Sequence, residues 1–320
     1  MNKRQRLEAF FTGQSVDRTP CCFWRHYTPE LERGEDVVEA HLKFYRETNQ
    51  DVVKISSDGY FGWPAQMLQN LEDVSALYHM DHVPGSHPYI REQVERAKAI
   101  VSALNGECFT FYTLFCPLSL FRLQVGWDKM MECVRQDPKA VMHACEVIAE
   151  DEMGLIQALI QEAGVDGIFY SVQNGEVTRF TLEEYKQIVE PSERKVMEFM
   201  GSLTPYNVMH CCGWDADVAG THNHLESWQN YPCGAVSWAS SVDKLDAKGI
   251  QAFFGKPAWG GFDNRKGKLL HVGTKEAIQT EARRLIAEAG NRGFMLGPDC
   301  SLPNDITTER IRWVVEAAKE

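Results

Sequence analysis

Three residues whose side chains bind soft metal ions stand out in the sequence: His210, Cys212 and Cys300. His210 and Cys212 lie two positions apart at the end of a predicted strand, so both side chains should point to the same face of that strand. Cys211 lies between them and should point the other way. Cys300 comes directly after the last predicted strand. Because catalytic groups gather at the carboxyl ends of the strands of a parallel barrel, the three side chains are expected to converge there.

This set of residues is typical of an open, catalytic zinc site. Imidazole and thiolate are ligands that Zn²⁺ prefers, and three protein ligands leave a fourth position for water or substrate. The sequence lacks the Cys-x-x-Cys pairs of structural zinc sites. Spacing alone is also compatible with buried thiols and a hydrogen-bonded histidine. The placement at strand ends is what favours a metal, which would hold a substrate thiol as thiolate or activate water.

The elements that must position these residues follow from a regular alternation of short apolar runs and longer amphipathic segments. Helices are expected at Pro138–Glu162 and Lys275–Ala289, where apolar residues recur every three or four positions. Eight runs predict strands: Pro20–Trp24, Val52–Ser56, Phe109–Thr113, Gly167–Tyr170, Asn207–His210, Ala235–Trp238, Ala258–Gly260 and Gly293–Leu296. Residues 1–320 are therefore expected to form one α/β domain, a single (β/α)8 TIM barrel with an N-terminal helical extension. A doubly wound sheet is disfavoured because no Gly-x-Gly-x-x-Gly turn follows the first strand.

Further candidate residues follow other predicted strands at the same end of the barrel. Asp58 and Asp263 are candidates for orienting the substrate, for completing the metal coordination or for acting as a general base. A strand-end aspartate is equally often a loop cap. The candidates for substrate binding are Arg25 and His26, which could hold an anionic group, together with Gln173 and the aromatic residues Tyr60, Trp63 and Trp214.

Composition excludes several classes of partner. The formal net charge is −12, which disfavours nucleic acid and anionic membrane surfaces because these partners need a basic face. The sequence does not open with a signal peptide pattern, and its ten cysteines then indicate a reducing compartment with free thiols. A cytoplasmic location is expected.

Four stretches match the motifs of one known family: Arg6 with Gly13 and Asp17-Arg18-Thr19-Pro20; His210-x-Cys212-Gly213; Trp259-Gly260-Gly261-Phe262-Asp263; and Gly297 with Cys300, Pro303 and Glu309-Arg310-Ile311. In these stretches the chain resembles the uroporphyrinogen decarboxylase superfamily over essentially its whole length. The resemblance implies a single (β/α)8 barrel. It also implies a choice between two branches of that superfamily.

The decarboxylase branch matches this sequence only in part. Asp58 falls where the decarboxylases place an essential aspartate, but only Arg25 stands for their two arginines after the first strand. Their late Gly-His-Gly is replaced by Gly297-Pro298-Asp299-Cys300. A metal-free decarboxylase-like lyase, using Asp58 and Arg25 on a tetrapyrrole or another carboxylate, is therefore the second hypothesis.

The methylcobalamin:coenzyme M methyltransferase branch carries the pattern His-x-Cys…Cys, and this chain fills all three positions with His210, Cys212 and Cys300. The resemblance implies a Zn²⁺ cofactor, a methylcorrinoid donor that is free cobalamin or a corrinoid protein, a small thiol acceptor, and a homodimer. A non-catalytic protein that binds a corrinoid or tetrapyrrole is the third hypothesis.

Overall fold

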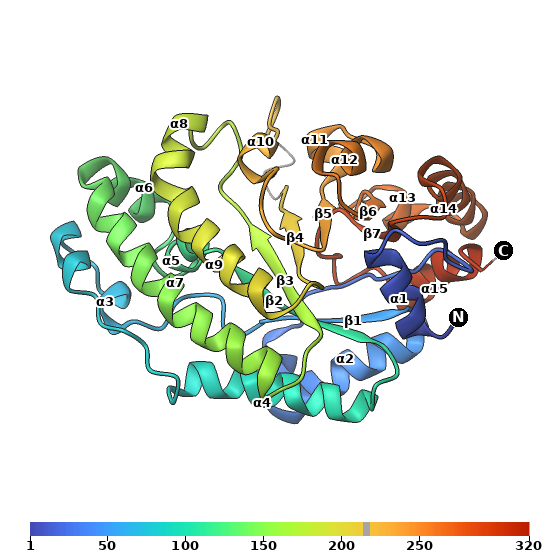
Figure 1. Cartoon of the computed structure of the whole chain (residues 1–320), viewed down its shortest axis with the longest axis horizontal. Coiled ribbons are helices and arrows are strands. Elements are labelled where there is room, and N and C mark those ends of the chain that lie inside the picture. Colours follow the sequence, from blue (N-terminus) through green and yellow to red (C-terminus); the bar gives the residue numbers. More distant parts are fainter. Residues whose placement is uncertain (214–217, 320) are drawn as a thin grey trace.

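The computed structural model describes residues 1–213 and 218–319 and contains a curved parallel sheet surrounded by helices (Figure 1). Among these residues the sheet has seven strands, each paired with its sequence neighbours in the order β1 to β7. The strands are β1 Val52–Ile55, β2 Phe109–Phe115, β3 Gly167–Val172, β4 Val208–Cys211, β5 Ala235–Trp238, β6 Ala258–Phe262 and β7 Phe294–Pro298.

Helices precede, connect and follow these strands, and the apolar sides of the longer helices after α1 pack on the outer face of the sheet. They are α1 Lys3–Phe11, η1 Pro29–Leu31, α2 Gly34–Thr48, α3 Gln66–Gln69, η2 Val74–His79, α4 Pro88–Leu104, α5 Pro117–Val125, α6 Trp127–Gln136, α7 Pro138–Gln161, α8 Leu182–Glu184, η3 Tyr185–Val189, α9 Glu190–Leu203, α10 Leu225–Trp228, α11 Ser240–Asp243, α12 Ala247–Phe254, α13 Leu269–Val272, α14 Lys275–Ala289 and α15 Thr308–Ala317. Within the described residues, no helix is both long and apolar enough to cross a membrane.

Successive residues of each strand point to opposite faces of the sheet, so the strands contribute to two apolar layers, one on each face. In β1, Val53 and Ile55 join the outer layer between sheet and helices, whereas Val52 joins a smaller inner cluster. The buried members of this inner cluster are Leu7, Phe10, Cys22, Trp24, Val52, Phe109, Phe111, Phe169, Val208, Ala235, Trp259 and Met295. The sheet therefore encloses its own core on the inner face.

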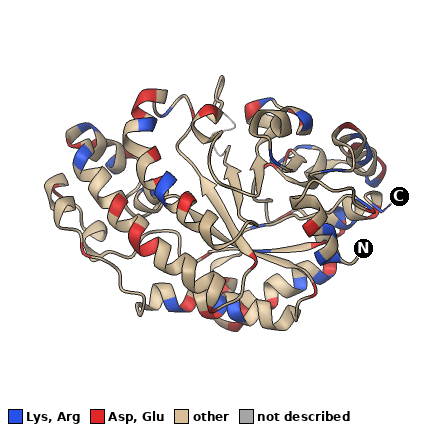
Figure 2. Ribbon diagram, viewed as in Figure 1, with Lys and Arg blue, Asp and Glu red and all other residues tan. Residues whose placement is uncertain are grey.

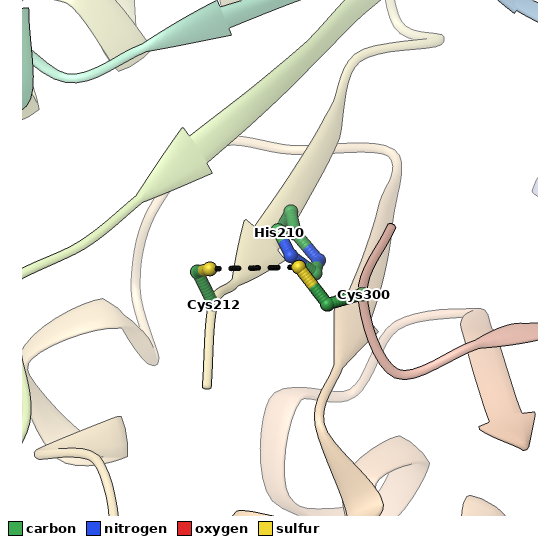
Figure 3. Close-up of side chains that lie close together, drawn as sticks. All are labelled: His210, Cys212 and Cys300. Carbon is green, nitrogen blue, oxygen red and sulfur yellow. Dashed lines mark hydrogen bonds between the residues drawn. The ribbon is translucent and has the colours of Figure 1, made fainter. Parts of the chain in front are cut away.

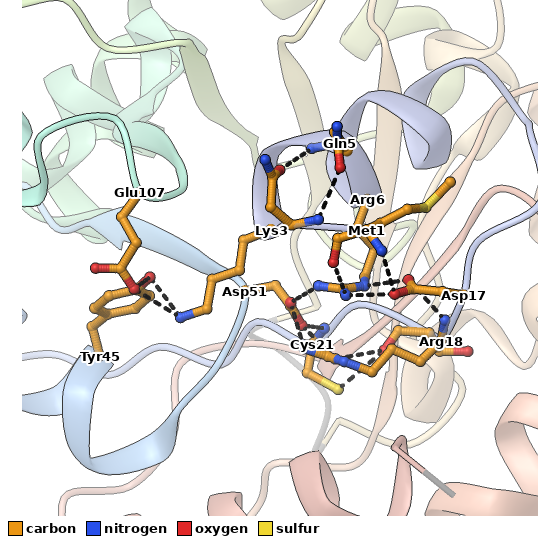
Figure 4. Close-up of polar contacts among 12 residues, drawn as sticks. Met1, Lys3, Gln5, Arg6, Asp17, Arg18, Cys21, Tyr45, Asp51 and Glu107 are labelled. Atoms are coloured by element: carbon orange, nitrogen blue, oxygen red, sulfur yellow. Dashed lines mark hydrogen bonds and ion pairs between the residues drawn. The ribbon is translucent and has the colours of Figure 1, made fainter.

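Helix α1 is the predicted N-terminal extension, and it covers one end of the inner cluster. Its side chains Leu7 and Phe10 are fully buried there. A network of charged groups ties α1 to the start of β1: Arg6 binds both Asp17 and Asp51, and Arg18 also binds Asp51 (Figure 4). The hydrogen bonds from Arg6 hold the pKa of Asp17 well below its usual range.

The prediction of a first strand at Pro20–Trp24 is wrong, because this segment forms a single isolated parallel bridge, between Cys21 and Leu296, and no regular strand. The Cys22 N–H donates to Leu296 of β7, and the Asp51 N–H donates to Cys21, so the segment lies between β7 and β1. A regular ladder does not form because side chains take its other backbone donors. The Cys21 N–H binds the Asp51 carboxylate, and the Phe23 N–H binds Gln50.

The other seven predicted strands are present, with shifted ends in several cases. The predicted Asn207–His210 is displaced by one residue because the Asn207 side chain instead accepts the Ile168 N–H at the start of β3. Gly293 lies outside β7 because its φ of 60° is incompatible with an extended strand. Figure 2 shows charged residues mainly on the outer helices, while the strands are largely uncharged.

Candidate functional site

The three predicted metal ligands come together at the carboxyl ends of β4 and β7. Their ligand atoms all lie within 4.8 Å of one another, and the Sγ atoms of Cys212 and Cys300 are 3.9 Å apart (Figure 3). His210 is in β4, Cys212 directly follows that strand, and Cys300 lies two residues beyond β7. Because the side chains of β4 alternate, Cys211 packs in the outer layer instead.

The environment of His210 leaves one ring nitrogen for a ligand. Its Nδ1 lies 3.0 Å from the hydroxyl oxygen of Ser237 on the neighbouring strand β5. Its Nε2 is buried and has no hydrogen-bond partner among the described residues. A buried polar atom without a partner costs about 1–3 kcal/mol. Metal-bound histidines typically donate their other N–H to such an outer partner, so the arrangement suits an Nε2 metal bond.

The two thiols share a hydrogen bond, which lowers the pKa of one thiol and raises the pKa of the other. This bond from Cys212 is the main reason that the pKa of Cys300 is lowered to about 7. The pKa of Cys212, which keeps the proton, is raised well above its usual value. One thiolate is therefore available near neutral pH, and a second is needed to complete a His/Cys/Cys donor set. This set fits Zn²⁺ by ligand type and by convergence.

Gln173 contacts Cys212 directly, and Arg122 in turn holds Gln173. The Nε2 of Gln173 donates to the Cys212 sulfur at 3.5 Å, and Arg122 donates to the Gln173 Oε1 at 2.8 Å. Arg122 is 8% exposed, so it is a buried residue of the site rather than a surface one. Sequence reasoning missed this role because Arg122 lies 51 positions before Gln173.

The three ligands open into a cavity of about 260 Å³. Its walls combine apolar and aromatic groups with a few polar ones, and no Asp or Glu is among the described residues that line it. The lining residues are Trp24, His26, Lys54, Phe61, Thr113, Phe115, Arg122, Leu123, Phe169, Ser171, Gln173, His210, Cys212, Cys300 and Ser301. A cavity of this size accommodates a small molecule.

Lys54 is a functional candidate that sequence reasoning missed. It is 7% exposed, and its ammonium lies 4.4 Å from the ring centre of Phe169 and 4.8 Å from that of Trp24. Burial lowers its pKa to about 8. The sequence signal for this residue is a lysine inside the apolar run Val52-Val53-Lys54-Ile55. Lys54 lies two positions after Val52, so both side chains point to the inner face of the strand.

His26 and Asp58 form a directly bonded pair at the same cavity. The Nδ1 of His26 lies 2.6 Å from Asp58 Oδ1, and the Tyr27 N–H donates to Asp58 Oδ2. Asp58 itself is fully buried, whereas the His26 side chain is 47% exposed. Burial raises the pKa of Asp58, but these hydrogen bonds and the charge of His26 outweigh it, so the net pKa is lowered.

Four other predicted residues do not line the cavity. Asp263 lies after β6 and binds Arg265 through both carboxylate oxygens, as a loop cap does. Arg25 turns away, donates to Ile306 O and packs on Phe44.

The two predicted aromatic residues also lie elsewhere. Tyr60 donates to Glu92 at another surface, and Trp63 is fully buried against Tyr89. Trp214 falls outside the described residues. Of the predicted substrate-binding residues, the cavity therefore contains His26 and Gln173.

The family of the chain follows from its sequence as well as from this geometry. Residues 53–320 match the model of the uroporphyrinogen decarboxylase (URO-D) family. The chain belongs to this family. No curated protein matches the sequence significantly.

Solved structures share the fold at low sequence identity. A methyltransferase from Methanosarcina mazei has a TM-score of 0.79 and 16% identity, with 99% of this chain and 98% of that chain covered. A B12-independent methionine synthase from Shewanella sp. W3-18-1, solved with selenomethionine, has a TM-score of 0.61 and 13% identity, with 94% and 97% covered. These likenesses establish a common fold.

Proposed function

We propose that this protein is a zinc-dependent methyltransferase that moves a methyl group from a methylcorrinoid to a small thiol. One observation carries the proposal: His210, Cys212 and Cys300 form an open three-ligand site at the wall of a small cavity. Three protein ligands leave a coordination position for a substrate, as catalytic zinc sites do. The M. mazei methyltransferase and the Shewanella methionine synthase lend support, because both share the fold.

When bound, zinc would hold the acceptor's sulfur as thiolate and so make it a nucleophile near neutral pH. The chain's own residues prepare for this. Ser237 and Gln173 orient His210 and Cys212. The largely apolar walls lower the local dielectric constant, which would strengthen the attraction between Lys54 and the anionic sulfur groups.

The size of the cavity supports different binding positions for the two substrates, one inside the cavity and one at its mouth. A volume of about 260 Å³ accommodates a small thiol. A methylcorrinoid, free or carried by a partner protein, is then proposed to present its methyl group at the mouth. Because the Shewanella protein is described as B12-independent, the corrinoid is the part of the proposal most in need of a direct test.

The finer features of the fold belong to the same proposal. The hydrogen bonds of Pro20–Trp24 to β7 and to Asp51 support a closed (β/α)8 barrel in which this segment occupies the position of the eighth strand. Residues 1–320 would then form one domain. A cytoplasmic location and a homodimer remain proposals of the same kind.

Metal analysis tests the proposal. Protein purified without chelators is expected to contain about one zinc per chain, and Cys212→Ser is expected to lose it. The matched control is Cys233→Ser, which removes a buried thiol outside the cavity and should keep the metal. Metal-free wild-type protein would contradict the zinc site and would favour the lyase hypothesis.

Methyl transfer is measured separately with methylcobalamin and a panel of small thiols. We expect loss of the methylcobalamin spectrum together with a methyl thioether product, and no product from Cys212→Ser. Zinc-loaded protein that shifts the cobalamin spectrum without forming a thioether would identify a binding protein instead. Release of CO₂ from a porphyrinogen by metal-free protein would identify a lyase.

A further inference from the structure

The acceptor thiol must lose a proton before it can act as a nucleophile, and the cavity contains few groups that can take it. A typical thiol has a pKa of about 8.5 and arrives mostly protonated at neutral pH. No Asp or Glu is among the described residues of the cavity wall. Arg122 is cationic, and the proposed function uses His210, Cys212 and Cys300 as ligands. Among the other described residues of the wall, His26 and Lys54, whose pKa is lowered to about 8, are the side chains that can act as a base, and His26 alone is paired with a carboxylate by a hydrogen bond.

The position of His26 suits this role. The extended segment that carries it places Trp24 and His26 on the same face, separated by roughly 6.6 Å along the chain. The Trp24 ring lies 6.0 Å from the ring of His210, and His26 lines the same cavity as Trp24 and the three proposed ligands. Its ring packs edge-on against Phe61, another residue of the wall. His26 is therefore a partly exposed side chain of the cavity that contains the proposed metal ligands.

The hydrogen bonds of Asp58 fix which nitrogen of His26 can accept a proton. One carboxylate oxygen accepts the Tyr27 N–H at 2.8 Å, and the other lies 2.6 Å from His26 Nδ1. A carboxylate is an acceptor only, so Nδ1 carries the hydrogen of the neutral ring and Nε2 carries the lone pair. The same division of roles orients the histidine in Asp-His-nucleophile enzymes.

We propose that His26, oriented by Asp58, accepts the proton of the acceptor thiol. The S–H bond breaks, its electron pair stays on sulfur, and the proton moves to Nε2 of His26. The resulting imidazolium is stabilised by the buried Asp58 carboxylate, and its exposed side returns the proton to water. His26 is thus a catalytic residue and Asp58 a positioning residue. This inference rests on the proposed function.

A second pair in the chain provides a matched control. His82 Nδ1 lies 2.7 Å from Asp151 Oδ1, and the following N–H, of Val83, donates to Asp151 Oδ2. This geometry repeats that of His26 and Asp58, but His82 does not line the cavity. His82→Gln therefore removes an equivalent local contact and is expected to leave thiol binding unchanged.

The test is a stopped-flow measurement of thiol binding to the cobalt(II)-substituted holoprotein, whose visible absorption changes when a thiolate reaches the metal. The probes are 2-mercaptoethanol, which is protonated near neutral pH, and pentafluorothiophenol, which is already a thiolate. We expect His26→Gln to slow binding of 2-mercaptoethanol by about 10²-fold, the usual scale of general base catalysis, and to leave binding of pentafluorothiophenol unchanged. Asp58→Asn should show the same selectivity, because it leaves the histidine in the wrong tautomer.

The outcomes separate the inference from the function on which it rests. Equal slowing of both thiols, or no slowing of either, in a His26→Gln protein that keeps its metal would overturn the proton-accepting role alone. Wild-type protein that binds neither zinc nor thiol would overturn the proposed function and the inference with it. Metal content and thermal midpoint of each variant establish that the protein is folded.

Discussion

The two ring nitrogens of His210 have different environments, and this difference suits the proposed role of the residue as a metal ligand. Nδ1 faces the Ser237 hydroxyl on β5, while Nε2 has no partner among the described residues. The serine holds the orientation of the ring through Nδ1 and leaves Nε2 for a ligand. We therefore expect Ser237 to increase the affinity of the proposed site for the metal without acting as a ligand itself.

Ser237→Ala is expected to weaken zinc binding by about 10- to 100-fold, the usual cost of losing an outer partner of a metal-bound histidine. Competition with a chromophoric chelator measures the dissociation constant. The control is Ser192→Ala, which removes a buried hydroxyl from α9. Equal zinc affinity in Ser237→Ala and wild type would show that the Nδ1 contact does not support the site.

At this scale the sequence predicted that His210, Cys212 and Cys300 converge and that Gln173 lies near them, but not the other residues around them. The spacing of His210 and Cys212 was sufficient to place both on one face because the two-residue period of a strand is local. Ser237 and Lys54 reach the site through strand register and through contacts across the cavity. Such contacts depend on tertiary packing, which no spacing along the chain reports.

Among the elements, β7 and the segment Pro20–Trp24 approach each other closely at Gly297. A Cβ atom there would lie 2.3 Å from Trp259 Nε1 and 2.8 Å from the Cys22 carbonyl oxygen. These two groups are also hydrogen-bonded to each other at 3.1 Å. Only a glycine allows this approach of β7, β6 and the segment.

Gly297→Ala is expected to lower the free energy of unfolding by about 1–3 kcal/mol, because the added methyl group forces these backbones apart. Urea denaturation measures the change. The comparison is Gly154→Ala in the middle of α7, where no atom lies within 4 Å of the new Cβ, and which should stabilise the protein by about 0.5–1 kcal/mol. An unchanged free energy of unfolding in Gly297→Ala would show that the close approach of Pro20–Trp24 to β7 at Gly297 does not contribute to stability.

Most helices and strands were predictable because the spacing of apolar residues along the chain shows which face of each element is buried. Lys275–Ala289 was predicted with both ends correct, aided by the Thr274 cap, and Ala235–Trp238 likewise. Pro20–Trp24 has the same apolar pattern as the true strands. It differs because Gln50 and Asp51 compete for its backbone donors, and that competition is a tertiary effect.

For the whole molecule, buried carboxyl groups connect stability to pH. Glu193 is fully buried on α9, and its Oε1 accepts hydrogen bonds from Tyr185, Trp228 and Tyr231. Burial raises its pKa from 4.5 to about 7. Between these two pH values the unfolded chain ionises first, so the folded state binds more protons and stability falls as pH rises.

We expect Glu193 to cost about 3 kcal/mol of stability by the upper end of this window, from 1.36 kcal/mol per pKa unit. Glu193→Gln cannot ionise and should show a flatter decline in urea midpoint from pH 5 to pH 8. Glu198→Gln, an exposed change on the same helix, serves as control. Parallel curves for Glu193→Gln and wild type would contradict the assignment.

The order of the sheet has a consequence for synthesis. Each strand pairs with its sequence neighbours, and Cys300 lies 88 residues after Cys212. At translation rates of about 5–20 residues per second, the ribosome adds Cys300 roughly 4–18 s after Cys212. During this interval a nascent chain carries His210 and Cys212 without their partner. The complete set of proposed ligands exists only after β7 has joined the sheet, so firm metal retention would mark a chain whose last strand is in place.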